Sequence, residues 1–126
     1  MHIYSFEKLD VWKDARQFVT WIYTATSSFP ADEKFGLVMQ LRRAAVSIVS
    51  NLAEGSARTS YKDKAHFSQI AYSSLIEVLN QLIIANDLGF LSNYLLSEGR
   101  CKIELLSSKV AALRNTQLSK LAKPYF

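Results

Sequence analysis

Two glutamates and three smaller polar residues are the side chains best placed to do chemistry. Ser47, Asn51 and Glu54 follow one another at helical spacing, and Ser74 and Glu77 stand three residues apart further along the chain. Residues three or four apart share a helix face. A pair of carboxylates suits general acid–base catalysis or metal binding. Alternatively, a buried hydrogen-bonded set fixes the register of two packed helices. We interpret the five as a polar network in the core.

The histidines and the cysteine give no recognisable site. A di-metal helical bundle uses Glu-x-x-His motifs, and neither His2 nor His66 follows a glutamate by three. Structural zinc requires four ligands of the Cys and His type. Cys101 lies between Arg100 and Lys102, and positive neighbours can activate a thiol, but no histidine base stands near it in the sequence. We predict no catalytic residue, no metal, no cofactor and no small-molecule substrate.

Basic residues form a second set of candidates, for contact with nucleic acid. Lysine and arginine neutralise phosphates, and exposed aromatic rings stack on unpaired bases. Tyr61 and Phe67 are interleaved with several of the basic residues. A solvated helix face has the same pattern, so this alternative stays open. The predicted contact residues are Arg42, Arg43, Arg58, Lys62, Lys102, Lys109, Arg114 and Lys120.

The positive charge of the chain is concentrated near its C-terminus. The net charge is +4, yet residues 1–98 hold nine Lys or Arg against ten Asp or Glu. Residues 99–126 hold six Lys or Arg against Glu104 alone. A localised basic surface favours an acidic partner such as nucleic acid. The alternative is a helix whose lysines only keep the protein soluble.

Composition and length indicate one folded domain, spanning residues 1–126. The 126 residues are 49% hydrophobic and 21% charged, with only four Gly and two Pro, so a few long elements are expected. A single cysteine excludes an intrachain disulfide and suits the cytoplasm. We expect no signal peptide and no membrane association, because no apolar run approaches the ~20 residues of a membrane span.

Helical periodicity predicts four helices, at residues 9–29, 32–55, 60–89 and 92–122. Proline at position 30 ends the first helix. We expect Asp32 to cap the second helix and Gly55 to end it in a left-handed conformation. Ser60, with Asp63 three residues later, marks the start of the third helix. Gly99 indicates either a break or a close helix contact within the fourth.

The connections between these helices are short, so consecutive helices should be antiparallel neighbours. The predicted fold is therefore all-α, an antiparallel up-down-up-down four-helix bundle. The apolar positions expected to face its core are Val11, Ala15, Phe18, Ile22 and Ala25 in the first helix, Leu37, Leu41, Ala44, Ala45, Ile48 and Leu52 in the second, Ala71, Leu75, Val78, Leu79, Leu82 and Ala85 in the third, and Leu95, Ile103, Leu106, Val110, Leu113 and Leu121 in the fourth.

Several segments resemble a known family. They include FEKLDVWK at residues 6–13, FGL at 35–37, QLRRAAVSI at 40–48 and NLAEG at 51–55. Their order and spacing resemble the four-helix-bundle proteins encoded by intervening sequences within bacterial 23S ribosomal RNA genes. The resemblance implies a four-helix bundle, and relatives of this type include ring-shaped homo-pentamers. A related branch is the accessory protein of diversity-generating retroelements, a basic five-fold barrel that binds nucleic acid and a reverse transcriptase. By that analogy Arg42, Arg43 and the C-terminal lysines contact nucleic acid.

Together these features predict a non-enzymatic, oligomeric bacterial protein of the cytoplasm that binds RNA or DNA through basic residues. The partners we expect are further copies of the chain, with a pentamer favoured by the resemblance, and RNA or DNA. The alternative is a protein–protein scaffold, or a self-assembling bundle, with no affinity for nucleic acid. It is suggested by six aromatic residues that one thin bundle does not easily bury: Trp12, Trp21, Tyr23, Phe35, Tyr72 and Phe90.

Overall fold

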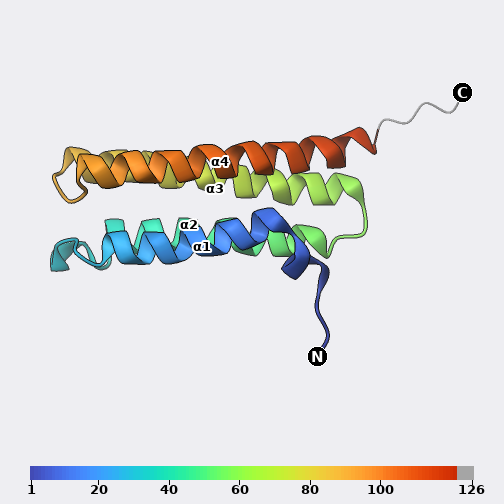
Figure 1. The fold of residues 1–126 in the computed structure, drawn as a ribbon, viewed down its shortest axis with the longest axis horizontal. Helices are drawn as coiled ribbons and strands as arrows, with labels where there is room; N and C mark the ends of the chain where they lie inside the picture. The colour runs from blue at the N-terminus through green and yellow to red at the C-terminus, as the bar shows by residue number, and fades with distance from the viewer. Residues whose placement is uncertain (122–126) are drawn as a thin grey trace, which may run out of the picture.

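The protein is an all-α, antiparallel four-helix bundle (Figure 1). A computed structural model describes residues 1–121. The four helices are α1 (Asp10–Thr26), α2 (Leu37–Ser56), α3 (Tyr61–Asp87) and α4 (Asn93–Ser119). Two short 3-10 helices precede α1 and α2, at Ser5–Lys8 and Ala31–Glu33. The expected last residue of the fourth helix, at position 122, lies outside the described residues.

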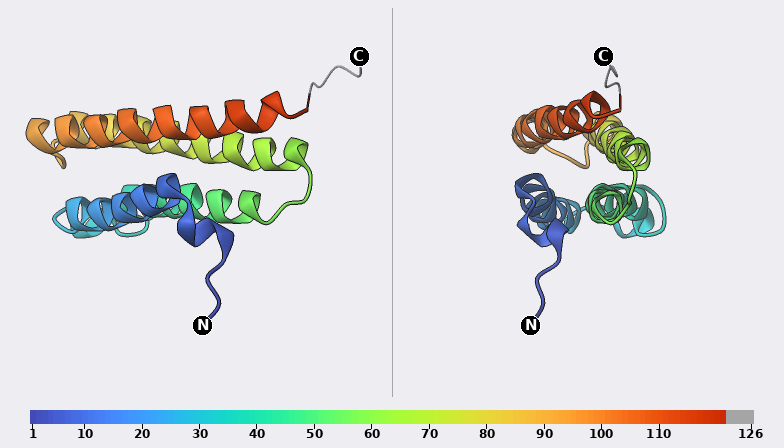
Figure 2. Two further views of the ribbon diagram at one scale, coloured as in Figure 1. Left: turned by 45° about the vertical axis from the view of Figure 1, so that its right-hand side comes forward. Right: turned by 90° about the vertical axis from the view of Figure 1, so that its right-hand side faces the viewer.

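The helices stand at the four corners of the bundle, as the end-on view in Figure 2 shows. Each helix packs on the helices before and after it in the chain, and α1 closes the circle against α4. The contacts of α3 with α2 and with α4 are the most extensive, whereas those between α1 and α4 are the fewest. At 1.5 Å per residue, α3 and α4 are each about 40 Å long and α1 only about 25 Å.

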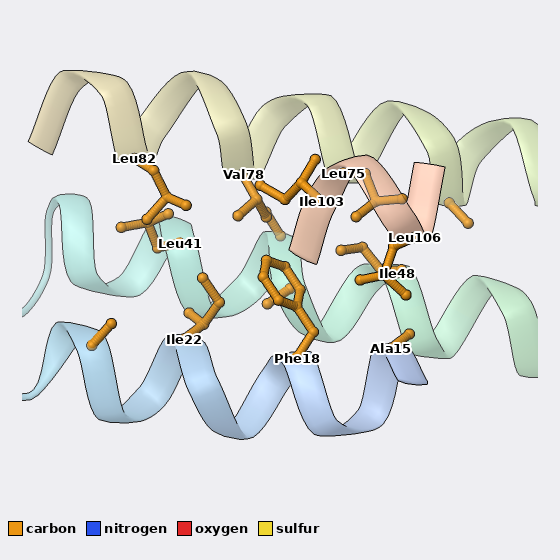
Figure 3. Close-up of a cluster of buried hydrophobic side chains, with 14 of the residues drawn as sticks. Ala15, Phe18, Ile22, Leu41, Ile48, Leu75, Val78, Leu82, Ile103 and Leu106 are labelled. Carbon is orange, nitrogen blue, oxygen red and sulfur yellow. The ribbon is translucent and has the colours of Figure 1, made fainter. Parts of the chain in front are cut away.

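The core is a layer of apolar side chains that point inward from all four helices (Figure 3). The predicted inward faces are confirmed for most positions, because long amphipathic helices must bury their apolar stripes together. Leu37, Leu79, Leu95 and Leu113 are partly buried at the edge of this core. The prediction is wrong for Leu121, which is exposed just after the end of α4.

The second helix begins five residues later than predicted, at Leu37. Gly36 precedes it with φ −105° and ψ −113°, a conformation outside the α region, so the helix cannot extend back through it. The side chain expected to cap this helix, Asp32, lies in the preceding 3-10 helix. Instead, Oε2 of Glu33 accepts a hydrogen bond of 3.0 Å from the backbone N–H of Leu37. The capping carboxylate therefore comes from one residue further along than predicted.

Two glycines allow helices to approach closely. Gly55 was expected to adopt a left-handed conformation, but it lies inside α2, and a Cβ there would meet Cβ of Phe67 on α3 at 2.9 Å. Its role is therefore close packing of α2 on α3. Gly99 was predicted to mark either a break in the fourth helix or a close helix contact, and the close contact is what the structure shows. A Cβ at this position would lie 2.8 Å from the indole ring of Trp21. We call this contact the α1–α4 seam.

The other helix ends follow simple local signals. Ser60 and Ser92 accept hydrogen bonds of 3.1 Å from backbone N–H groups three residues later, so both cap the helices that they precede. The predicted capping pattern at Ser60 and Asp63 is confirmed. Helix α1 ends at Thr26 rather than 29, and the next residues form a turn that leads into Pro30.

Candidate nucleic-acid interface and polar groove

Three of the predicted polar residues form one hydrogen-bonded set between α2 and α3. The hydroxyl oxygens of Ser47 and Ser74 are 3.0 Å apart. Nδ2 of Asn51 donates to the backbone oxygen of Ser47 at 2.8 Å and to its hydroxyl at 3.0 Å. Ser74 is buried, whereas Ser47 and Asn51 are partly buried. The set therefore links the two helices at one register.

Glu77 belongs to a neighbouring group that includes a residue the sequence did not single out. Its Oε2 accepts a hydrogen bond of 3.2 Å from Nε2 of Gln81, and the same amide lies 3.4 Å from Oε1 of Gln40. Gln81 is only 6% exposed. Its Oε1 accepts no hydrogen bond from any residue that the structure describes. Gln81 was missed because it lies within an apolar run of the third helix.

The two carboxylates that we considered as a catalytic or metal-binding pair do not lie together. The helices are antiparallel and Ser47 faces Ser74, so Glu54 and Glu77 lie on opposite sides of that contact. Seven residues of α2 and three of α3 separate them along the axis, or about 15 Å at 1.5 Å per residue. Glu54 is exposed and takes no part in the hydrogen-bonded set described above. The five-residue network predicted from the sequence therefore reduces to three residues, with Glu77 beside them.

No metal cluster is evident in residues 1–121, where no three His, Cys, Asp or Glu side chains lie together as metal ligands would. Cys101 is exposed on α4. No helix within these residues combines the length and the apolar character needed to cross a membrane.

Four of the eight basic residues meet at one end of the bundle. The end of α2, the start of α3 and the end of α4 come together there because the helices alternate in direction (Figure 1). Lys64, on the first turns of α3, adds a fifth cation and donates from Nζ to the backbone oxygen of Ser56 at 3.1 Å. We call this region the basic end, and it comprises Arg58, Lys62, Lys64, Arg114 and Lys120.

Aromatic rings hold three of these cations. The guanidinium carbon of Arg58 lies 4.5 Å from the ring centre of Phe67. Nζ of Lys120 lies 5.1 Å from the ring centre of Tyr61. Arg114 lies over Tyr72 at 5.8 Å and also donates a hydrogen bond to Gln69. Contact with a ring orients a cation without neutralising its charge, so these groups remain able to attract phosphate.

Lys102 and Lys109 lie further back along α4, away from the basic end. Lys109 forms an ion pair with Asp14 of α1, and the two side chains are 41% and 35% exposed. Its charge is therefore partly compensated within the chain. Lys102 is exposed and borders a shallow groove between α1 and α4, to which Asp14 also contributes.

Arg42 and Arg43 are adjacent in sequence but differ in their surroundings. Arg42 lies over the ring of Tyr23 at 4.4 Å, and its Nε donates to Oγ1 of buried Thr26 at 3.0 Å. Arg43 is exposed. Both line a surface groove of about 590 Å³ along α2, which we call the α2 groove. Its lining residues are Tyr23, Lys34, Phe35, Val38, Met39, Arg42, Arg43, Val46, Ser47 and Ser50.

Comparison with protein-family models places the chain in a family. The model described as 23S rRNA-intervening sequence protein matches residues 7–112. This range includes the α2 groove and the polar set, and it ends just before Arg114 and Lys120. A comparison with curated proteins gave no match.

Proposed function

Because the chain belongs to the 23S rRNA-intervening sequence protein family, we propose that it is a non-enzymatic, self-associating helical bundle that binds RNA or DNA through its basic end. The family is not a known enzyme family. The two carboxylates considered as a catalytic pair, those of Glu54 and Glu77, lie far apart along the bundle axis. We further propose that the protein acts in the cytoplasm, which suits a chain with a single cysteine.

The observation that carries this proposal is the excess of cations at the basic end. Five cations from α2, α3 and α4 gather there, against Glu54 and Asp63 on the stretches 54–72 and 105–121. The N-terminal segment that packs at the same end adds Lys8, Glu7 and Asp10, so the described residues of this end keep an excess of cations. Cations neutralise the phosphates of a nucleic acid and release the counterions bound to them. Tyr61 is 40% exposed, so the part of its ring that Lys120 does not cover is accessible to an unpaired base. This arrangement suits a single strand better than the major groove of a duplex.

Part of this positive charge also has a structural role. Arg58 and Lys120 follow the C-terminal ends of α2 and α4, where the helix dipole favours cations. This stabilisation also covers Lys64, whose Nζ donates to the backbone oxygen of Ser56, the last residue of α2. It does not account for Lys62, which lies in the first turn of α3, where the dipole disfavours positive charge.

The test is a fluorescence-anisotropy titration of a labelled single-stranded RNA, and of the DNA of the same sequence, at salt concentrations between about 50 and 200 mM. The variant Lys62→Gln/Lys120→Gln removes two exposed charges of the basic end. If each cation neutralises one phosphate, the slope of log affinity against log salt should become shallower by about 1.4. The matched control, Lys13→Gln/Arg100→Gln, removes two exposed charges elsewhere and should keep the slope of the native chain.

Absence of binding at about 50 mM salt would exclude the proposed function. If the control made the slope of log affinity against log salt equally shallow, only the net charge of the chain would matter. This result would exclude the basic end as the interface. Tighter binding of RNA than DNA would indicate contacts with the 2′-hydroxyl groups.

We propose in addition that the chain assembles with copies of itself, with a pentamer favoured by the family resemblance. This part of the proposal is supported by large apolar side chains at the surface, such as Phe35, Tyr94 and Leu105, which are 78%, 75% and 58% exposed. Light scattering should then give a multiple of the 14.3 kDa chain mass. The same observation favours the second candidate function, a scaffold for proteins that binds no nucleic acid.

A further inference from the structure

We infer that the α2 groove is the binding site for the exposed face of α3 of a second copy of the chain. This inference rests on the proposed self-association and identifies the two surfaces that would make it. It does not involve the basic end, and of the polar set between α2 and α3 only Ser47 also lines the groove.

The lining of the α2 groove combines apolar side chains with cations. Val38, Met39 and Val46 are aliphatic, and the rings of Tyr23 and Phe35 add further apolar surface. Phe35 is 78% exposed, so a large ring stands in water unless something covers it. Lys34, Arg42 and Arg43 supply the cations, and none of the described residues that line the groove is acidic. Arg43 also borders a smaller pocket that Glu77 of the same chain lines. The groove therefore suits a partner that offers apolar side chains flanked by carboxylates.

The outer face of α3 offers that chemistry. Ile76 and Ile84 on α3, and Leu88 just after its end, are exposed and stand eight and four residues apart, so at about 100° per residue they spread over about a third of the helix circumference. Glu77 and Asp87 lie within the same third of the circumference and are also exposed. From residue 65 to residue 99 the chain contains no Lys or Arg. We call these five residues the α3 ridge.

The two surfaces also match in length. On α2 the groove covers twelve residue steps, from Val38 to Ser50, which is about 18 Å of helix. The ridge covers the same number of steps, from Ile76 to Leu88. An amphipathic helix that enters a groove through regularly spaced apolar anchors is a common mode of recognition.

The charges also determine the symmetry of the contact. If the grooves of two copies packed on each other, three cations would face three cations. If two ridges packed on each other, carboxylates would face carboxylates. Groove against ridge pairs opposite charges, so the contact joins different surfaces of the two copies. Contacts of this kind repeat from one copy to the next, and they close into a ring or extend into a filament.

Charge reversal tests this assignment, with mass measured by light scattering. The groove variant is Lys34→Glu/Arg43→Glu, and the ridge variant is Glu77→Lys/Asp87→Lys. Reversing both charges on a surface makes the test independent of the direction in which the helix lies. Each variant alone should reduce the mass to that of one chain, 14.3 kDa, at concentrations where the native chain is assembled. The variant with all four changes should recover the native mass.

The control Lys13→Glu/Arg100→Glu reverses two exposed cations outside both surfaces and should assemble like the native chain. Far-UV circular dichroism checks that each variant is folded. Assembly that survives both the groove and the ridge changes would overturn this surface assignment and leave self-association standing. A native chain that is monomeric at all concentrations would overturn the proposed self-association itself.

Discussion

Replacing Gln81 by methionine should make the protein more stable, although the change deletes two hydrogen bonds. Gln81 is buried on α3, and its Oε1 is a buried acceptor that receives no hydrogen bond from residues 1–121. An unsatisfied buried polar group costs about 1–3 kcal/mol. Methionine has an unbranched side chain of similar length and volume, and it has no amide that must be satisfied. The substitution therefore removes a penalty that the native chain carries.

The hydrogen bonds that are lost contribute little. The amide of Gln81 donates to Glu77 at 3.2 Å and to Gln40 at 3.4 Å, and both acceptors are on exposed residues. Water can replace the amide at both, so we expect each loss to be below the typical ~1 kcal/mol of a hydrogen bond. The net stabilisation should be about 1–2 kcal/mol. For an m-value of about 2 kcal/mol/M, the urea midpoint then rises by about 0.5–1 M.

The same substitution at Gln117 is the matched control and should have the opposite sign. Gln117 is also buried, but its Oε1 accepts a hydrogen bond of 2.7 Å from the hydroxyl of Ser68, which is 3% exposed. Gln117→Met leaves that buried hydroxyl without its acceptor, so stability should fall by about 1 kcal/mol. Urea unfolding is followed by circular dichroism at one fixed protein concentration, because assembly would also shift the midpoint. A Gln81→Met variant that is less stable than the native chain would refute this reasoning.

Two further substitutions test the contact between α2 and α3. Gly55→Ala should destabilise the protein by about 1–2 kcal/mol in thermal unfolding, because the overlap with Cβ of Phe67 outweighs the ~1 kcal/mol that alanine gains in a helix; a more stable variant would contradict the close approach. A double-mutant cycle of Ser47→Ala and Ser74→Ala should give a coupling of about 0.5–1.5 kcal/mol. Additive effects would mean that the hydroxyl contact does not link the helices.

The fold was predictable because its helices are long and strongly patterned. Ile22, Ile48 and Val78 each belong to a series of apolar residues at helical spacing, in three different helices, and all three are buried as expected. The errors are local. The start of α2 depends on the backbone of Gly36, and the role of Gly55 depends on its neighbour Phe67 on another helix. Neither dependence can be read from the sequence near these glycines.

The candidate sites were less predictable because their geometry depends on pairs that are distant in sequence. The ion pair of Lys109 with Asp14 spans 95 positions, and the contact of Lys120 with Tyr61 joins two helices. Side chains that are adjacent in sequence also have different surroundings, because consecutive residues of a helix point about 100° apart. Arg42 is therefore bound against Tyr23, whereas Arg43 is free to face solvent.

The α1–α4 seam has a practical consequence for following this protein in solution. Both tryptophans of the chain, Trp12 and Trp21, belong to α1. Trp21 covers Gly99, stacks on Phe18 and donates from its indole nitrogen to Glu98 at 2.5 Å. Intrinsic emission therefore reports chiefly on whether the first helix is docked, whereas circular dichroism reports on all four. A red shift that precedes the loss of ellipticity would reveal detachment of this helix as a separate step.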